Sequence, residues 1–167
     1  IAGLIFFILG VFTANAKVSN PALVEFRLQC EKASTQCLEM NLPDADEKIL
    51  LEKEPRLTLQ HVARAEYVVY QNSKEMRAKY PGMAAEQYNV LLYLTPQGRD
   101  ILADITEKNM GKRLAILIRG KLIMAPTIRE QITEGIMQIV GGYGGVSSQD
   151  LKELASEINS LVSKNTP

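Results

Sequence analysis

Residues 88–125 read YNVLLYLTPQGRDILADITEKNMGKRLAILIRGKLIMA, and this stretch decides the fold class. The apolar run at 88–94 predicts a strand. Thr95 and Pro96 then predict the start of a helix, because a threonine hydroxyl caps free amide groups and proline is tolerated at the first helical position. The next apolar run, Leu114–Ile118, predicts a strand that is covered on both faces.

The sequence that follows predicts a hairpin. Arg119 and Gly120 form the expected tight turn into a strand at 122–125, and Pro126 ends regular pairing there. One more strand is expected at 136–140.

A final helix is expected at the C-terminal end. Ser147 and Asp150 have the spacing of a capping box. The apolar residues after them are three and four positions apart, which is typical of a helix with one buried face. These residues are Leu151, Leu154, Ala155, Ile158, Leu161 and Val162.

The N-terminal half contains shorter sequence patterns that predict secondary structure. Alternation of apolar and charged residues predicts a strand at 22–28, and short apolar runs predict strands at 48–52 and 67–70. The polar stretch 29–47 is expected to be a surface loop, and 71–87 a loop or a short helical excursion around its Tyr-Pro-Gly turn signal. Thr58 is expected to cap a short helix through residue 65.

These elements together predict an α+β fold. The expected architecture is a mixed or antiparallel sheet on which two main helices pack, at about 96–110 and 147–162.

The charge balance argues against a general nucleic-acid binder. The 167 residues include 19 lysines and arginines and 19 aspartates and glutamates. Nucleic-acid binding requires an excess of basic residues that displaces counterions from the phosphates. We therefore expect no nucleic-acid partner.

The first sixteen residues resemble a secretory signal peptide. An apolar run at 1–12 is followed by Ala14-Asn15-Ala16, a small-x-small cleavage pattern. We expect 1–16 to be removed and 17–167 to form a single periplasmic or secreted domain. The alternative is an uncleaved membrane anchor.

The only two cysteines, Cys30 and Cys37, are separated by six residues in a polar stretch. In an oxidising compartment such a pair is typical of a small disulfide loop. Two free thiols are the alternative. A zinc site is a poor interpretation, since four ligands are needed and the chain has a single histidine.

Few residues suggest catalysis. His61 is the only imidazole, and nothing in its spacing proposes a nucleophile or an orienting acid, so we expect an ordinary surface or half-buried residue. No metal site, cofactor or catalytic residue is predicted. The glycines at 141–145 follow a strand and precede a helix, as in a phosphate loop, but lack a lysine and are expected to form a turn.

One charge cluster stands out. Between residues 108 and 129 the sequence has six basic residues and no acidic one. Five of them form a candidate binding patch for an anionic lipid surface or an acidic polypeptide, namely Lys112, Arg113, Arg119, Lys121 and Arg129. The alternative, which we favour, is a solvated hairpin neutralised by Asp100, Asp104 and Glu107.

Several blocks of the sequence resemble one protein family. They are LVEFRL at 23–28, LEKEPRLT at 51–58, LYLTPQG at 92–98, TEKNMGKRLA at 106–115 and IVGGY at 139–143. In order and spacing they are similar to the head part of the large extracytoplasmic domain of SecD, a preprotein translocase subunit. Family-motif positions that the resemblance marks as structural are Gly98, Asn109, Gly111, Gly120, Pro126, Gly135 and Gly142.

The sequence also departs from the family. Arg119-Gly120 stands where the family has Asp-Gly, and the connection from Ala65 to Val90 is longer. SecD carries transmembrane helices after this domain, which the sequence here does not show, so we expect a stand-alone SecD-like protein.

The resemblance implies a non-enzymatic module that binds polypeptides or a partner protein, in protein export or envelope quality control. Binding of a small ligand or of an anionic membrane surface is the second hypothesis. An unrecognised hydrolase is the third, and it requires a deep pocket with facing carboxylates of shifted pKa.

Overall fold

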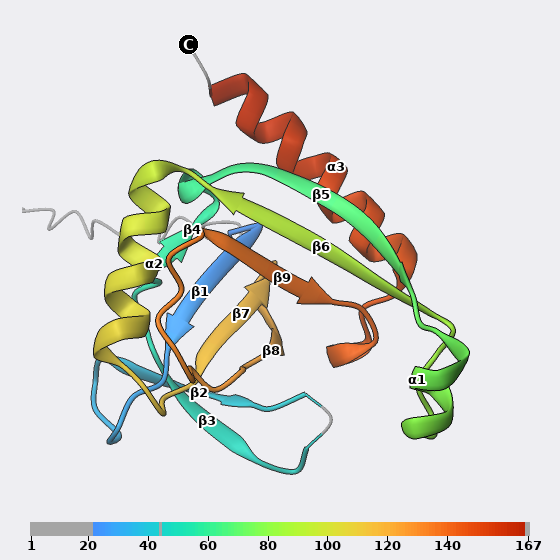
Figure 1. The fold of residues 1–167 in the computed structure, drawn as a ribbon. Coiled ribbons are helices and arrows are strands. Elements are labelled where there is room, and N and C mark those ends of the chain that lie inside the picture. Colours follow the sequence, from blue (N-terminus) through green and yellow to red (C-terminus); the bar gives the residue numbers. More distant parts are fainter. Residues whose placement is uncertain (1–21, 44, 166–167) are drawn as a thin grey trace, which may run out of the picture.

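The structure is a computed structural model that describes residues 22–43 and 45–165 (Figure 1). The expected signal segment, 1–16, lies outside the described residues. Strands form three antiparallel sheets, and three α-helices and two short 3-10 turns connect or cover them. The α+β prediction is confirmed, although the strands divide into three sheets where one was expected. Within the described residues, no helix is both long and apolar enough to cross a membrane.

A four-stranded sheet forms the centre of the molecule. Its order is β4 (Leu57–Thr58), β1 (Val24–Leu28), β7 (Leu114–Ile118) and β8 (Lys121–Met124). Every residue of β7 is buried, which confirms the prediction of a strand covered on both faces. β7 and β8 form the expected hairpin, and β8 is an edge strand of the sheet.

A separate hairpin covers one face of this sheet. It consists of β2 (Cys37–Asn41) and β3 (Lys48–Glu52), and its apolar side chains form a small second core with Ala115, Leu117 and Leu122. The prediction of a surface loop at 29–47 is therefore wrong. β2 is a strand because its alternate residues, Leu38 and Met40, pack onto this core.

A three-stranded sheet lies over the other face. Its order is β5 (Val62–Gln71), β6 (Glu86–Leu94) and β9 (Ile136–Val140). The predicted helix from Thr58 to residue 65 is wrong, because only a 3-10 turn, η1 (Leu59–His61), forms before β5 begins. Val62 and Ala65 are instead buried in the main core as strand residues.

Two helices complete the main core. α2 (Pro96–Lys108) begins as expected, with the Thr95 hydroxyl accepting a hydrogen bond from the Gly98 amide at 3.1 Å. It ends two residues before the expected position 110. α3 (Ser148–Asn165) follows the expected capping box, in which the Ser147 hydroxyl accepts from the Asp150 amide and Asp150 accepts from the Ser147 amide.

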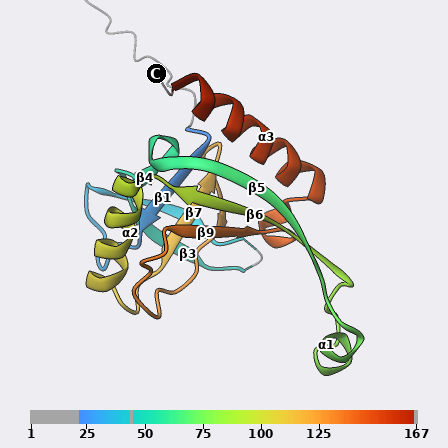
Figure 2. The same cartoon turned by 45° about the horizontal axis from the view of Figure 1, so that its top comes forward.

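The outer part of the β5–β6 hairpin extends away from the body as an arm. Residues 69–88, which we call the arm, carry the short helix α1 (Lys74–Lys79) at the tip. This helix agrees with the short helical excursion expected within 71–87. Figures 1 and 2 show the arm leaving the body on the side where α3 begins.

Candidate functional site

An apolar groove lies over strand β8. Its volume is about 430 Å³, and three segments far apart in the sequence line it: the turn after β2, the end of β8, and the 3-10 turn η2 (Tyr143–Gly145). We call it the β8 groove. Its main lining residues are Leu42, Pro43, Met124, Ala125, Pro126 and Tyr143.

A second hollow extends the groove along the strand. It has a volume of about 380 Å³ and shares Leu42 and Pro43 with the β8 groove. Met40 and Leu122 line its walls, so the continuous surface is mainly apolar. Tyr143, whose exposed fraction is 54%, stands at the margin of the groove as a large accessible aromatic ring.

One wall depends on close packing of η2 against β8. A Cβ atom added to Gly144 would lie 3.0 Å from the carbonyl oxygen of Ile123, and Gly144 has a φ of +58°. A larger residue would push η2 away from the strand. The Lys121 ammonium donates a hydrogen bond of 2.7 Å to the Gly144 carbonyl and fastens the same contact.

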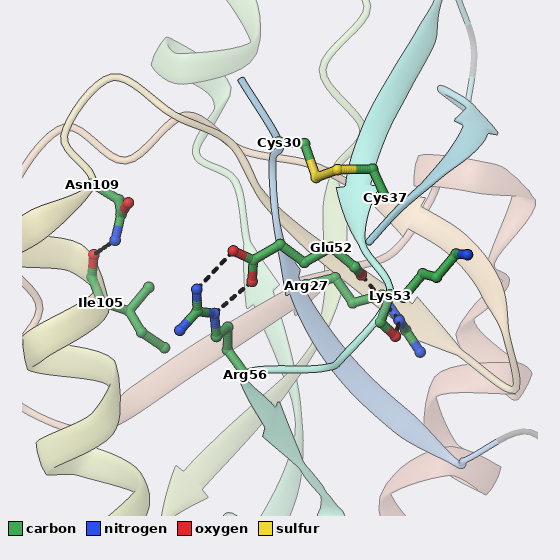
Figure 3. A network of polar contacts seen from close by, with 8 residues as sticks. All are labelled: Arg27, Cys30, Cys37, Glu52, Lys53, Arg56, Ile105 and Asn109. Carbon is green, nitrogen blue, oxygen red and sulfur yellow. Dashed lines mark hydrogen bonds and ion pairs between the residues drawn. A yellow bond between two sulfur atoms is a disulfide. The ribbon is translucent and has the colours of Figure 1, made fainter. Parts of the chain in front are cut away.

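The opposite wall belongs to the β2–β3 hairpin, which covalent and polar contacts hold in place (Figure 3). The Cys30–Cys37 disulfide, expected from the sequence, is present and joins the segment just after β1 to the first residue of β2. Arg27 of β1 donates to the Glu52 carbonyl at 3.0 Å. Arg56 donates to both carboxylate oxygens of Glu52, at 2.5 and 2.6 Å. The hairpin is therefore anchored at the end that lies away from the groove.

The charges at the groove are few. Glu47 and Arg113 are the charged residues of its lining, and most of the other lining residues are apolar. Such a surface can hold apolar side chains of a partner and leave the polar backbone of that partner near the rim.

The carboxyl groups do not favour the hydrolase hypothesis. Among the described carboxyl groups, every one with a displaced pKa has a pKa below its ordinary value. These groups are Glu31, Glu66, Glu75, Glu86 and Asp150. In each case a hydrogen bond to the carboxylate is the largest cause. A catalytic acid needs the opposite displacement, a raised pKa. No group of three potential metal ligands is found in the described part of the chain.

Comparison with known proteins then places the fold. The family model described as the SecDF P1 head subdomain matches residues 35–160, from just before β2 to near the end of α3. The chain belongs to the SecDF P1 head family. Protein translocase subunit SecD of Desulfurispirillum indicum is 30% identical over 142 residues, covering 80% of this chain and 27% of that protein. SecD of Calditerrivibrio nitroreducens is 28% identical over 143 residues, covering 80% of this chain and 28% of that protein.

Solved structures share the P1 head fold. The chain matches a structure of SecDF, described as a membrane component that enhances protein export, with a TM-score of 0.58 and 24% identity. The match covers 84% of this chain and 63% of that one. SecDF in a super-membrane-facing form gives the same TM-score and identity, with 19% of its chain covered. The present chain spans about a quarter of the length of the SecD relatives named above.

The family-motif positions of this P1 head domain lie at turns and element ends. Asn109 donates from its side chain to the Ile105 carbonyl at 2.9 Å and so closes the end of α2 (Figure 3). In the β7–β8 turn, Arg119 and Gly120 have φ values of +48° and +76°, so arginine occupies a conformation that favours glycine. The other positions also lie at element ends. Gly98 is in the first turn of α2, Gly111 follows α2, Pro126 follows β8, Gly135 precedes β9 and Gly142 precedes η2.

The structure does not gather the candidate basic patch into one cluster. Lys112 and Arg113 precede β7, whereas Arg119 and Lys121 flank its far end. Lys112 forms an ion pair with Glu31 at 2.8 Å, and Arg119 pairs with Glu157. Arg129 is exposed in the loop after β8. The acidic partners are Glu31, which follows β1, and Glu157 of α3. From the sequence, acidic residues of α2 were instead expected to neutralise these charges.

His61 is a buried structural residue. It is buried, with an exposed fraction of 7%, so the expectation of a surface or half-buried residue is wrong. Its Nδ1 accepts a hydrogen bond from the Thr58 amide at 3.0 Å, and its carbonyl accepts from the Thr95 amide at 2.8 Å. His61 therefore ties η1 to the start of α2.

The sequence patterns did not predict the β8 groove. Its residues come from three short segments, and none of those segments carries a recognisable motif. The signal that could have helped is the exposed Tyr143 inside a glycine-rich turn, because a large aromatic residue in such a turn has little core to pack against.

Proposed function

We propose that this P1 head domain binds extended, apolar segments of unfolded polypeptides in the β8 groove. The observation that supports the proposal is the apolar groove beside an outermost strand, with Tyr143 exposed at its margin. An unfolded chain presents apolar side chains that a folded protein hides, and an apolar groove selects for them.

The names of the relatives support a setting for this activity in protein export. One similar solved protein is described as enhancing protein export, and the SecD relatives are named as translocase subunits. We infer that the present domain works outside the cytoplasm, on chains that are being exported or monitored in the envelope. Its role is to hold and release these chains without breaking bonds.

Site-directed photo-crosslinking tests this function. A photo-reactive amino acid in place of Tyr143 is expected to crosslink to a reduced, unfolded secretory protein. The same amino acid at Ser160, an exposed residue of α3, serves as the matched control. Crosslinking at position 143 that does not exceed crosslinking at position 160 would count against the proposal.

A further inference from the structure

The tip of the arm exposes large apolar side chains. Met76 and Tyr80 are 45% and 46% exposed, and Val69 and Tyr70, in the last part of β5 before α1, are 41% and 45% exposed. We call these four residues together with α1 the arm tip. They account for most of the large apolar side chains that the described structure leaves open, because Met110, Ile136 and Tyr143 are the others.

Three cations lie among these apolar side chains. Lys74, Arg77 and Lys79 belong to α1, and within the described residues none of them forms an ion pair. This differs from Lys112 and Arg119, whose charges are paired with acidic residues.

The single acidic residue of α1 does not neutralise them. The pKa of Glu75 lies below its ordinary value because its carboxylate accepts hydrogen bonds from its own amide and from the Ser73 hydroxyl. Glu75 is thus engaged with the start of the helix. The Lys79 ammonium lies 5.3 Å from the centroid of the Tyr80 ring, which places a cation and an aromatic ring on the same side of the tip.

The shape of the tip suits a flat partner. The arm projects beyond the body, so α1 can meet a plane before the rest of the molecule does (Figure 2). The β8 groove and its extension lie on the body and contain no arm residue. An unfolded polypeptide is held by a groove or a strand edge, whereas a projecting tip with apolar and cationic side chains matches a bilayer interface.

We propose that the arm tip binds the surface of an anionic phospholipid bilayer. Met76 and Tyr80 enter the interfacial region, where an amphipathic aromatic ring is favoured. Lys74, Arg77 and Lys79 contact the lipid phosphates, which supply the negative charge that the protein does not provide. This site is separate from the β8 groove and does not depend on the proposed polypeptide binding.

Tryptophan fluorescence tests the proposal, because the chain contains no tryptophan. In a Tyr80→Trp variant the single reporter lies at the arm tip. Vesicles of phosphatidylcholine and phosphatidylglycerol in equal parts are expected to shift its emission to the blue and to allow quenching by brominated acyl chains. Phosphatidylcholine alone should give little change, and added salt should weaken the effect.

Charge reversal identifies the contact residues. In the Tyr80→Trp background, Lys74→Glu with Lys79→Glu is expected to weaken vesicle binding at least about tenfold. Lys32→Glu with Lys164→Glu changes the net charge equally at exposed positions away from the arm and should bind nearly as well as the parent. Equal losses in the two double variants, or no blue shift with anionic vesicles, would overturn the proposal.

A second reporter separates this site from the groove. A Tyr143→Trp variant is expected to respond to an unfolded secretory polypeptide and not to vesicles. A Tyr80→Trp signal that responds to the polypeptide instead of the vesicles would assign the arm tip to polypeptide binding and would also overturn the membrane proposal. Failure of Tyr143→Trp to respond counts only against the proposed function.

Discussion

Gly98 allows α2 to cross close to η1. A Cβ atom at this position would lie 2.5 Å from the His61 carbonyl oxygen and 2.9 Å from the His61 Cβ. Alanine in place of glycine normally stabilises a helix by about 1 kcal/mol. We expect the clash to reverse that sign, so that Gly98→Ala lowers the free energy of unfolding by about 1–3 kcal/mol.

Urea denaturation measures this difference. Ser156→Ala, at an exposed position of α3, is the matched control and should be neutral or slightly stabilising. A Gly98→Ala protein as stable as the parent would show that α2 and η1 can move apart at no cost.

Asp150 makes the capping box of α3 sensitive to pH. Its pKa is lowered from the ordinary value of 3.8, mainly because the Ser147 hydroxyl and amide donate to the carboxylate. The resulting stability is complete above the pKa of the unfolded chain and is lost as the pH falls through the lower pKa of the folded chain. Asp150→Asn keeps an acceptor oxygen without the charge.

The two proteins are therefore expected to differ in stability at neutral pH and to converge as the pH falls below about 4. Thermal unfolding of both proteins across this pH range checks the expectation. A difference that stays constant to the lowest pH would mean that the charge of Asp150 does not contribute.

At the scale of elements, the Asn159 side chain joins α3 to the free edge of β5. The Asn159 amide oxygen accepts from the Ala65 amide at 2.8 Å, and its NH₂ group donates to the Ala65 carbonyl at 2.9 Å. Asn159→Ala is expected to cost about 1–2 kcal/mol of unfolding free energy, since it removes both hydrogen bonds.

Denaturant unfolding with Ser160→Ala as control measures the cost of losing this side chain. Ser160 is the exposed next residue of α3, and its substitution should change the stability by less than about 0.5 kcal/mol. If Asn159→Ala is equally silent, the apolar face of α3 and its other polar contacts, such as the Tyr67–Ser148 hydrogen bond, hold the helix without Asn159.

The disulfide fixes the hairpin that walls the groove. It closes a short loop, with a sequence separation of 7 residues. Replacing both cysteines by serine is expected to lower the free energy of unfolding by about 2–3 kcal/mol in the chain-entropy model. Chemical denaturation measures the loss, and reduction of the parent protein should reproduce it. A stable reduced protein would mean that the Arg27 and Arg56 contacts to Glu52 suffice.

Sequence patterns predicted the elements that bury a clear apolar face. They failed where pairing or packing with another element of the chain decides the conformation. β7 was recognised from its continuous apolar run, and α3 from apolar residues three and four positions apart. β2 was missed, since it buries only Leu38 and Met40 against a small core. Val62 and Ala65 were assigned to a helix because Thr58 resembles a cap, but pairing of β5 with β6 overrides that local preference.

At the scale of the whole molecule, the groove exists only after the layers have assembled. The β2–β3 hairpin, β8 and η2 each contribute a wall, and their residues are separated by up to a hundred positions in the chain. Periodicity reports which face of one element is buried, and it carries no information on the space left between three of them. The fold class and family could therefore be predicted, whereas the site could not.

Polypeptide binding in the β8 groove is tested by a map of backbone amide NMR shifts as an unfolded secretory polypeptide is added. We expect the perturbed amides to concentrate at the β8 groove, around Leu42, Met124 and Tyr143. Met124→Glu should weaken binding at least about tenfold, because it places an unpaired charge against the apolar segment. Perturbations confined to α3 or the arm, or binding that Met124→Glu leaves unchanged, would contradict polypeptide binding in the groove.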